Sequence, residues 1–170
     1  MIEIRAASLE DADAIAELHV AAWRWAYRDQ LPEEFLAKLS VDERRAQWES
    51  TLAASEPAAG TFVAERGGRI VGFTNFGPTT DADGSDGTGE VHSIYLDEAV
   101  VGTGVGRQLF ERAHVALRDA GFTRATLWVL ESNARTRRFY EKAGWSWDGT
   151  TSSHDFECGN LPIVRYAADL

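Results

Sequence analysis

The chain has 170 residues, with 17 Lys and Arg against 27 Asp and Glu, so its formal net charge is −10 when the four His are neutral. This length suits one domain, and 44% hydrophobic residues provide enough apolar surface for one core. The acidic balance argues against binding to a nucleic-acid backbone or an anionic membrane. We therefore expect a single domain over residues 1–170 with no nucleic-acid or membrane partner.

The sequence carries no signal for a membrane span, a disulfide or a metal site. No run approaches the roughly 20 apolar residues of a membrane span, and no basic and then apolar leader opens the chain. We therefore expect a cytoplasmic protein. Cys158 is the only cysteine, so no internal disulfide can form. Neither a CxxC pair nor an HExxH run is present, and we expect no metal.

An amphipathic helix is predicted near the N-terminus, after a short strand at Ile2–Arg5. Ser8 with Asp11 three residues later resembles the capping box that starts a helix. From there to about Tyr27, apolar residues recur at intervals of three and four, which buries one face. Trp25 and Tyr27 fall off that face, so each is a candidate for the wall of a binding pocket as well as for the core.

Two shorter helices and a β-hairpin are expected next. The first helix is expected to begin at Pro32, and the second to cover Asp42–Leu52. The two strands of the hairpin cover Thr61–Glu65 and Ile70–Phe76. The strands are joined through Gly67–Gly68, and because glycine adopts positive φ at little cost, this pair predicts a tight turn.

An acidic loop is predicted over Pro78–Gly89. Asp81, Asp83 and Asp86 alternate there with glycines, a composition that cannot form a core of its own. The simplest interpretation is a mobile, solvated connector between two strands. The alternative is that its carboxylates help to select a ligand.

Three glycines at alternate positions, Gly102, Gly104 and Gly106, separate a strand at Glu90–Leu96 from a helix that runs to Gly121. Such a loop lets several backbone N–H groups point into one concavity at the positive end of the helix, which is an anion site. Each helix-end contact contributes only about 0.3 to 1 kcal/mol, so the site depends on several of them converging.

Two common glycine motifs do not fit this loop. A Walker loop needs Lys and then Ser or Thr after its last glycine, whereas Arg107 and Gln108 follow here. A dinucleotide fingerprint needs a third small residue at a spacing that falls on Arg107 or Leu109. The P-loop and Rossmann interpretations therefore fail.

The glycine loop and a second motif together resemble the GNAT superfamily of acetyl-CoA-dependent N-acetyltransferases. The second motif follows a strand at Arg124–Leu130 and covers Asn133–Trp145, with Phe139 and Tyr140 at its centre. Both occur in the family's order, and the clear resemblance covers about Thr61–Trp147. It implies an α/β fold with a mixed, largely antiparallel sheet of about seven strands flanked by helices.

The resemblance also implies acetyl-CoA as cosubstrate. The amides of the glycine loop would bind its pyrophosphate, and the preceding strand would bind its pantetheine amides. Val101 replaces the Gln or Arg that the family often has there, so one side-chain contact is lost. The cofactor-binding residues expected in this way are Ile94, Tyr95, Leu96, Val101, Gly102, Thr103, Gly104, Val105, Gly106, Arg107, Asn133, Arg138 and Tyr140.

Two of these assignments have simpler alternatives. Asn133 stands where a strand gives way to a helix, so it can act as a helix cap as well as contact the pantetheine. Arg138 can reach a phosphate, although Arg135, Arg137 and Arg138 together can also form a solvated helix face.

Acetyl transfer to an amine needs one group that removes a proton from the amine and another that protonates the departing thiolate. The resemblance implies Glu90 as the base, acting through water, and His92 on the same strand face is the competing candidate. Tyr140 is the expected general acid, because a phenol beside the sulfur can donate to a thiolate. A base elsewhere, deprotonation by solvent and a packing role for Tyr140 are the alternatives.

The acceptor is expected to be a small cationic amine, bound by Trp25, Tyr27 and Glu90. Aromatic rings and the carboxylates of the acidic loop would attract such a cation. Direct attack in a ternary complex is favoured because Cys158 lies outside both motifs.

Two other functions and one assembly fit the same motifs. The chain could be a non-catalytic CoA-binding sensor or interaction module, or its acceptor could be a protein or peptide. Strand edges near Trp145–Thr150 and Ile163–Ala167 would allow a homodimer.

Overall fold

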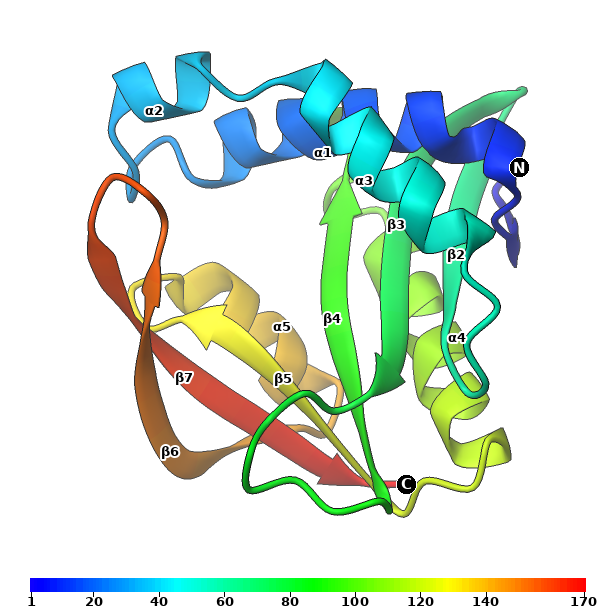
Figure 1. Ribbon diagram of the computed structural model, residues 1–170, viewed down its shortest axis with the longest axis vertical. Helices are drawn as coiled ribbons and strands as arrows, with labels where there is room; N and C mark the ends of the chain where they lie inside the picture. Colours follow the sequence, from blue (N-terminus) through cyan, green and yellow to red (C-terminus); the bar gives the residue numbers. More distant parts are fainter.

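Seven strands form one sheet in the order β1-β2-β3-β4-β5-β7-β6 in the computed structural model, which describes residues 1–170 (Figure 1). The strands are β1 (Glu3–Ala6), β2 (Gly60–Arg66), β3 (Arg69–Pro78), β4 (Thr88–Leu96), β5 (Arg124–Leu130), β6 (Ser146–Asp155) and β7 (Asn160–Asp169). The helices are α1 (Ala12–Ala26), α2 (Glu33–Ala37), α3 (Val41–Ala53), α4 (Val105–Asp119) and α5 (Ala134–Lys142), with 3₁₀ turns η1 (Leu9–Asp11) and η2 (Glu98–Val100). Only β4 and β5 pair in parallel, so the predicted mixed, largely antiparallel sheet is confirmed.

The first helix starts as its capping signal predicts. The backbone N–H of Ser8 donates to Asp11 Oδ2 at 2.7 Å, and Arg5 donates to the same carboxylate at 2.8 Å. The apolar face of α1 then packs with α3 on one face of β2 and β3, in a cluster that contains Trp48 and Phe73. Helix α4 packs on β2, β3 and β4 through two further clusters.

The hairpin and the acidic loop differ in how well the sequence predicted their bounds. Gly67 and Gly68 both have positive φ, at 59° and 78°, so the tight turn is confirmed. The acidic loop is shorter than predicted, because Pro78 still belongs to β3 and Thr88 already begins β4. Cross-strand pairing of Pro78 with Gly89 extends both strands into the predicted loop.

The two central strands share hydrogen bonds only at their beginnings. Thr88, Gly89 and Glu90 pair with residues 124–126 of β5, and beyond this point the strands separate. Figure 1 shows β4 and β5 pointing in different directions, with α5 behind β5. The side of β4 that faces β5 is therefore unpaired beyond Glu90, in the middle of the sheet.

One of the two strand edges expected to allow a dimer is not an edge. Ile163–Ala167 belongs to β7, which pairs with β5 on one side and with β6 on the other. The outer strand is β6, on which Trp147 is 49% exposed. None of the helices combines the length and the apolar character needed to cross a lipid bilayer.

A half-buried histidine among the aromatic rings of the core gives the fold a pH-dependent stability. His19 Nδ1 accepts a hydrogen bond from Trp48 Nε1 at 3.1 Å, and its ring stacks on Tyr95 with centroids 5.2 Å apart. Burial, together with the charge of Arg44, lowers the pKa of His19 from 6.5 to about 3. Below pH 6.5, His19 therefore binds a proton in the unfolded chain but stays neutral in the folded protein.

We expect His19 to make the protein less stable as the pH falls from 7 to 5. The unfolded state binds more protons in this range, so the free energy of unfolding falls with pH, by about 2 kcal/mol at pH 5. His19→Gln keeps an acceptor for Trp48 and removes the titrating group. Urea denaturation of both proteins at pH 7 and pH 5 measures the effect, and an equal loss in the two would contradict it.

Candidate functional site

A cleft of about 680 Å³ occupies the gap between β4 and β5. One wall consists of β4 and the glycine loop, the other of the end of β5 and helix α5, and the C-terminal end of α1 closes one side. The cleft exists because β4 and β5 stop pairing after Glu90. Eleven of the thirteen residues expected to bind the cofactor line it, namely Ile94, Tyr95, Leu96, Val101, Gly102, Gly104, Gly106, Arg107, Asn133, Arg138 and Tyr140.

The glycine loop has the backbone geometry that the sequence predicted. Gly102 and Gly104 have φ of 81° and 92°, in the left-handed region where other residues are strained. Gly106 is needed for space, since a Cβ there would lie 3.1 Å from Leu96 Cδ1. The loop ends at Gly104, the residue before α4, so the unpaired N–H groups of the helix begin directly after it.

Two of the backbone N–H groups expected to bind the pyrophosphate already have partners within the protein. The N–H groups of Val101 and Thr103 donate to the carbonyls of Glu98 and Val100, each at 3.2 Å, because η2 continues directly into the loop. Thr103 and Val105 also lie outside the cleft wall, and the Val105 side chain is buried in the core. The amides left for a ligand are those of the loop glycines and of the first turn of α4.

Helix α5 faces the cleft with a row of basic side chains, at Arg135, Arg138 and Lys142. The expectation that three arginines form a solvated face is wrong for Arg137, whose Nε donates to the Tyr166 hydroxyl at 3.1 Å. Asn133 caps α5 by accepting from the N–H of Thr136 at 3.2 Å, and it lines the cleft as well. The spacing of three and four between the basic residues was the signal for a shared face.

A β-bulge in β4 at His92 decides which side chains of this strand share a face of the sheet. Asn75 of β3 pairs with Ser93, but the next residue, Phe76, pairs with Val91, so His92 is the extra residue. The alternation of faces that a regular strand would have therefore fails beyond His92. Ile94 packs with Val91 against the α4 side of the sheet, instead of sharing a face with Glu90 and His92.

Glu90 and His92 form a hydrogen-bonded pair. His92 Nδ1 lies 2.8 Å from Glu90 Oε2, and the Thr79 hydroxyl donates to Glu90 Oε1 at 3.0 Å. Burial raises the pKa of Glu90, but the hydrogen bond and charge of His92 and the bond from Thr79 outweigh it, and the net shift is downward from 4.5. Glu90 is only 7% exposed and lies outside the cleft wall, whereas His92 is part of it. Nε2 of His92 is therefore the nitrogen left for a ligand.

Three tyrosines meet on the walls of the cleft. Tyr140 is buried, and its burial, with a smaller contribution from Tyr95, raises the pKa of its phenol above 10.0. The hydroxyls of Tyr27 and Tyr95 are 3.0 Å apart, and burial likewise raises the pKa of Tyr27. Trp25 and Tyr27, the two aromatic residues predicted to fall off the buried face of α1, both line the cleft. All three phenols therefore stay protonated at neutral pH.

The acidic loop is exposed over residues 82–86, as expected of a solvated connector, but ion pairs tie it to the sheet. Arg165 of β7 binds Asp83 at 2.7 Å, Asp148 at 2.7 Å and Asp81 at 3.1 Å, while Trp128 Nε1 donates to Asp81 at 2.9 Å. Two of the loop carboxylates expected to attract a cation are thus already paired with a buried guanidinium. No three His, Cys, Asp or Glu side chains in the structure are placed to hold a metal ion.

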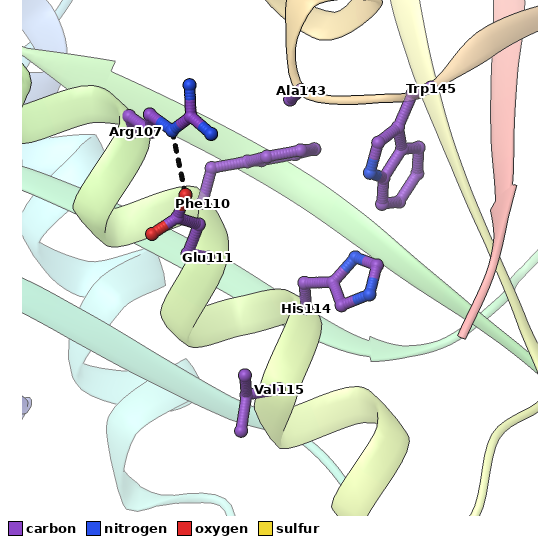
Figure 2. Close-up of a pocket in the computed structure, with 7 residues that line it drawn as sticks. All are labelled: Arg107, Phe110, Glu111, His114, Val115, Ala143 and Trp145. Carbon is purple, nitrogen blue, oxygen red and sulfur yellow. Dashed lines mark hydrogen bonds and ion pairs between the residues drawn. The ribbon is translucent and has the colours of Figure 1, made fainter.

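A second pocket, of about 300 Å³, lies beside α4 (Figure 2). Its walls are Arg107, Phe110, Glu111, His114, Val115, Ala143 and Trp145. Figure 2 shows Arg107 paired with Glu111, at 2.7 Å, on one side and the rings of His114 and Trp145 on the other. The pocket shares Arg107 and Ala143 with the cleft but contains none of the candidate catalytic residues, so the cleft is the candidate active site.

Comparison with known proteins agrees with this fold. The profile of the acetyltransferase (GNAT) family matches residues 13–145. An uncharacterized N-acetyltransferase of Bacillus subtilis is 36% identical over 135 residues, which are 78% of this chain and 74% of that protein. A mycothiol acetyltransferase of Thermobispora bispora is 39% identical over 89 residues, which are 52% of this chain and 30% of that protein. The PaiA N-acetyltransferase of Thermoplasma acidophilum, solved in complex with coenzyme A, shares the fold, with a TM-score of 0.78 at 21% identity over 97% of this chain and 98% of that one.

Proposed function

The chain belongs to the acetyltransferase (GNAT) family, and we propose that it transfers the acetyl group of acetyl-CoA to the amine of a small molecule by direct attack in a ternary complex. The observation that carries this proposal is the content of one cleft. It contains a glycine loop at a helix start, a histidine held by a buried carboxylate, and a buried phenol that keeps its proton. These are the groups that binding, deprotonation and thiolate release require.

The residues of the cleft fit acetyl-CoA. The glycine amides and the first turn of α4 would hold the pyrophosphate, and Arg138 and Lys142 on the opposite wall would neutralise phosphate charge. The unpaired side of β4 beyond Glu90 offers backbone groups to the pantetheine amides. When bound, acetyl-CoA supplies an acetyl group activated as a thioester.

His92 is the group we assign to removal of the amine proton. Nδ1 faces the charged Glu90 carboxylate at 2.8 Å, which holds the ring and stabilises the imidazolium that forms when Nε2 takes a proton. Glu90 itself lies outside the cleft wall, so we assign it as the positioning residue rather than the base. The sequence offered both residues as candidates for the base. We divide their roles because His92 lines the cleft, whereas Glu90 is only 7% exposed.

Tyr140 is the group we assign to the departing thiolate. Its raised pKa keeps the hydroxyl protonated at the working pH, so it can donate as negative charge develops on sulfur. The pair His92 and Tyr140 also favours an enzyme over a CoA-binding sensor, because binding alone requires neither group.

We expect the purified protein to release free CoA from acetyl-CoA only when an amine is present. A thiol-detecting reagent measures the release across amino acids, polyamines, aminoglycosides and short peptides. Peptide turnover without small-molecule turnover would favour the protein-acceptor alternative. Binding of CoA by calorimetry without release in any mixture would favour the sensor.

Tyr140→Phe is expected to lower kcat by about 100-fold or more, with the KM for acetyl-CoA within about twofold, because it removes the donating hydroxyl and little volume. Steady-state kinetics at saturating amine measures both constants. Phe139→Leu on the neighbouring position serves as a packing control. An unchanged kcat in Tyr140→Phe would remove the general-acid assignment.

His92→Gln is expected to lower kcat by about 100-fold and to abolish the acidic limb of the pH–rate profile. Glu90→Gln keeps an acceptor for Nδ1 but removes the charge beside the ring, so we expect a smaller loss of kcat with the acidic limb still present. If Glu90→Gln instead eliminates the limb while His92→Gln preserves it, Glu90 is the base.

A further inference from the structure

The cleft is basic although the chain as a whole is acidic. Its charged wall residues are Arg28, Arg107, Arg135, Arg138 and Lys142, against the single carboxylate of Asp29. Asp29 comes no closer than 4.0 Å to Arg28, and both are exposed. Arg107 has a partner in Glu111, but no ion pair of the structure includes Arg135, Arg138 or Lys142. The cleft thus presents uncompensated positive charge.

Three of the four carboxylates expected to attract a cationic acceptor are already engaged. Asp81 and Asp83 bind Arg165, and Glu90 binds His92 and Thr79. None of these three lines the cleft, which weakens the expectation drawn from composition.

Arg135 lies at the α1 end of the cleft, away from the glycine loop. Its guanidinium is 5.2 Å from the centroid of the Trp25 ring, and that of Arg28 is 5.9 Å from the same ring. The glycine loop instead meets the other end of α5, because a Cβ on Gly106 would lie 3.6 Å from Phe139. Four residues of helix separate Arg135 from Phe139, a shift of about 6 Å along the axis.

The basic residues therefore divide into two groups. Arg107, Arg138 and Lys142 lie on the glycine-loop side and suit the phosphates of the cosubstrate. Arg28 and Arg135 flank Trp25, whose Nε1 is buried without a hydrogen-bond partner. The two guanidinium groups on this indole form a site for a planar anion.

We propose that the acceptor carries a carboxylate as well as its amine, and that Arg135 and Arg28 beside Trp25 bind this carboxylate. The inference rests on the proposed acetyl transfer and names its substrate class as amino acids and short peptides with a free carboxylate. Binding at this end leaves the amine to the part of the cleft that holds His92. Arg135 is a specificity-determining residue in this arrangement.

The test compares matched acceptors in the thiol-release assay. Each amino acid is measured beside its carboxamide and its decarboxylated amine, with wild type, Arg135→Gln and Arg28→Gln. The control is Arg66→Gln, an arginine at the β2–β3 turn that lies outside the cleft. Dividing the acid-to-amide ratio of kcat/KM in the variant by that in wild type cancels differences in amine basicity.

We expect wild type to prefer the acid by about tenfold or more, and Arg135→Gln to remove most of that preference. Arg28→Gln should also weaken this preference. In Arg66→Gln the acid-to-amide ratio should stay within about twofold of wild type, and in all variants the KM for acetyl-CoA should do the same. Equal use of acid and amide by wild type would overturn the inference and leave acetyl transfer standing. A higher KM for acetyl-CoA in Arg135→Gln with an unchanged acid-to-amide ratio would assign Arg135 to the cosubstrate. Absence of release with every amine would overturn acetyl transfer itself, and this inference with it.

Discussion

The cleft depends on how few hydrogen bonds join β4 to β5. Pairing ends after Glu90, so two neighbouring strands in the middle of a sheet leave backbone donors and acceptors unpaired. Buried backbone groups without partners are costly, and a ligand with amides of its own can satisfy them. The same separation places the ends of both strands apart, so the glycine loop after β4 and helix α5 after β5 become opposite walls of one site.

A single inserted residue decides what faces that cleft. The bulge at His92 returns Ile94 to the α4 side of the sheet and leaves the imidazole on the cleft wall beside a buried carboxylate. Without the bulge, strict alternation would have placed Ile94 with Glu90 and His92. The α4 core would then lose a partner, because Ile94 packs on the same cluster as Val91.

Features set by local sequence were predictable, and features set by distant partners were not. The capping box at Ser8, the Gly67–Gly68 turn and the left-handed glycines of the loop each follow from a few neighbouring residues, and all are present. The bulge depends on how β3 aligns with β4, which a period-two pattern cannot show. The Arg165 ion pairs join residues more than 80 positions apart, so composition alone suggested free carboxylates in the acidic loop.

Net charge was a poor guide to the ligand for the same reason. A formal charge of −10 suggests attraction for cations, yet the potential inside a cleft depends on the nearest uncompensated groups, not on the total. Arg165 pairs with three carboxylates, and surface acids are screened by salt within about 10 Å. What remains in the cleft is the basic face of α5 with Arg28 and Arg107. An acidic protein can therefore offer basic groups to a polyanionic cosubstrate and, at the other end of the same cleft, to the carboxylate of an acceptor.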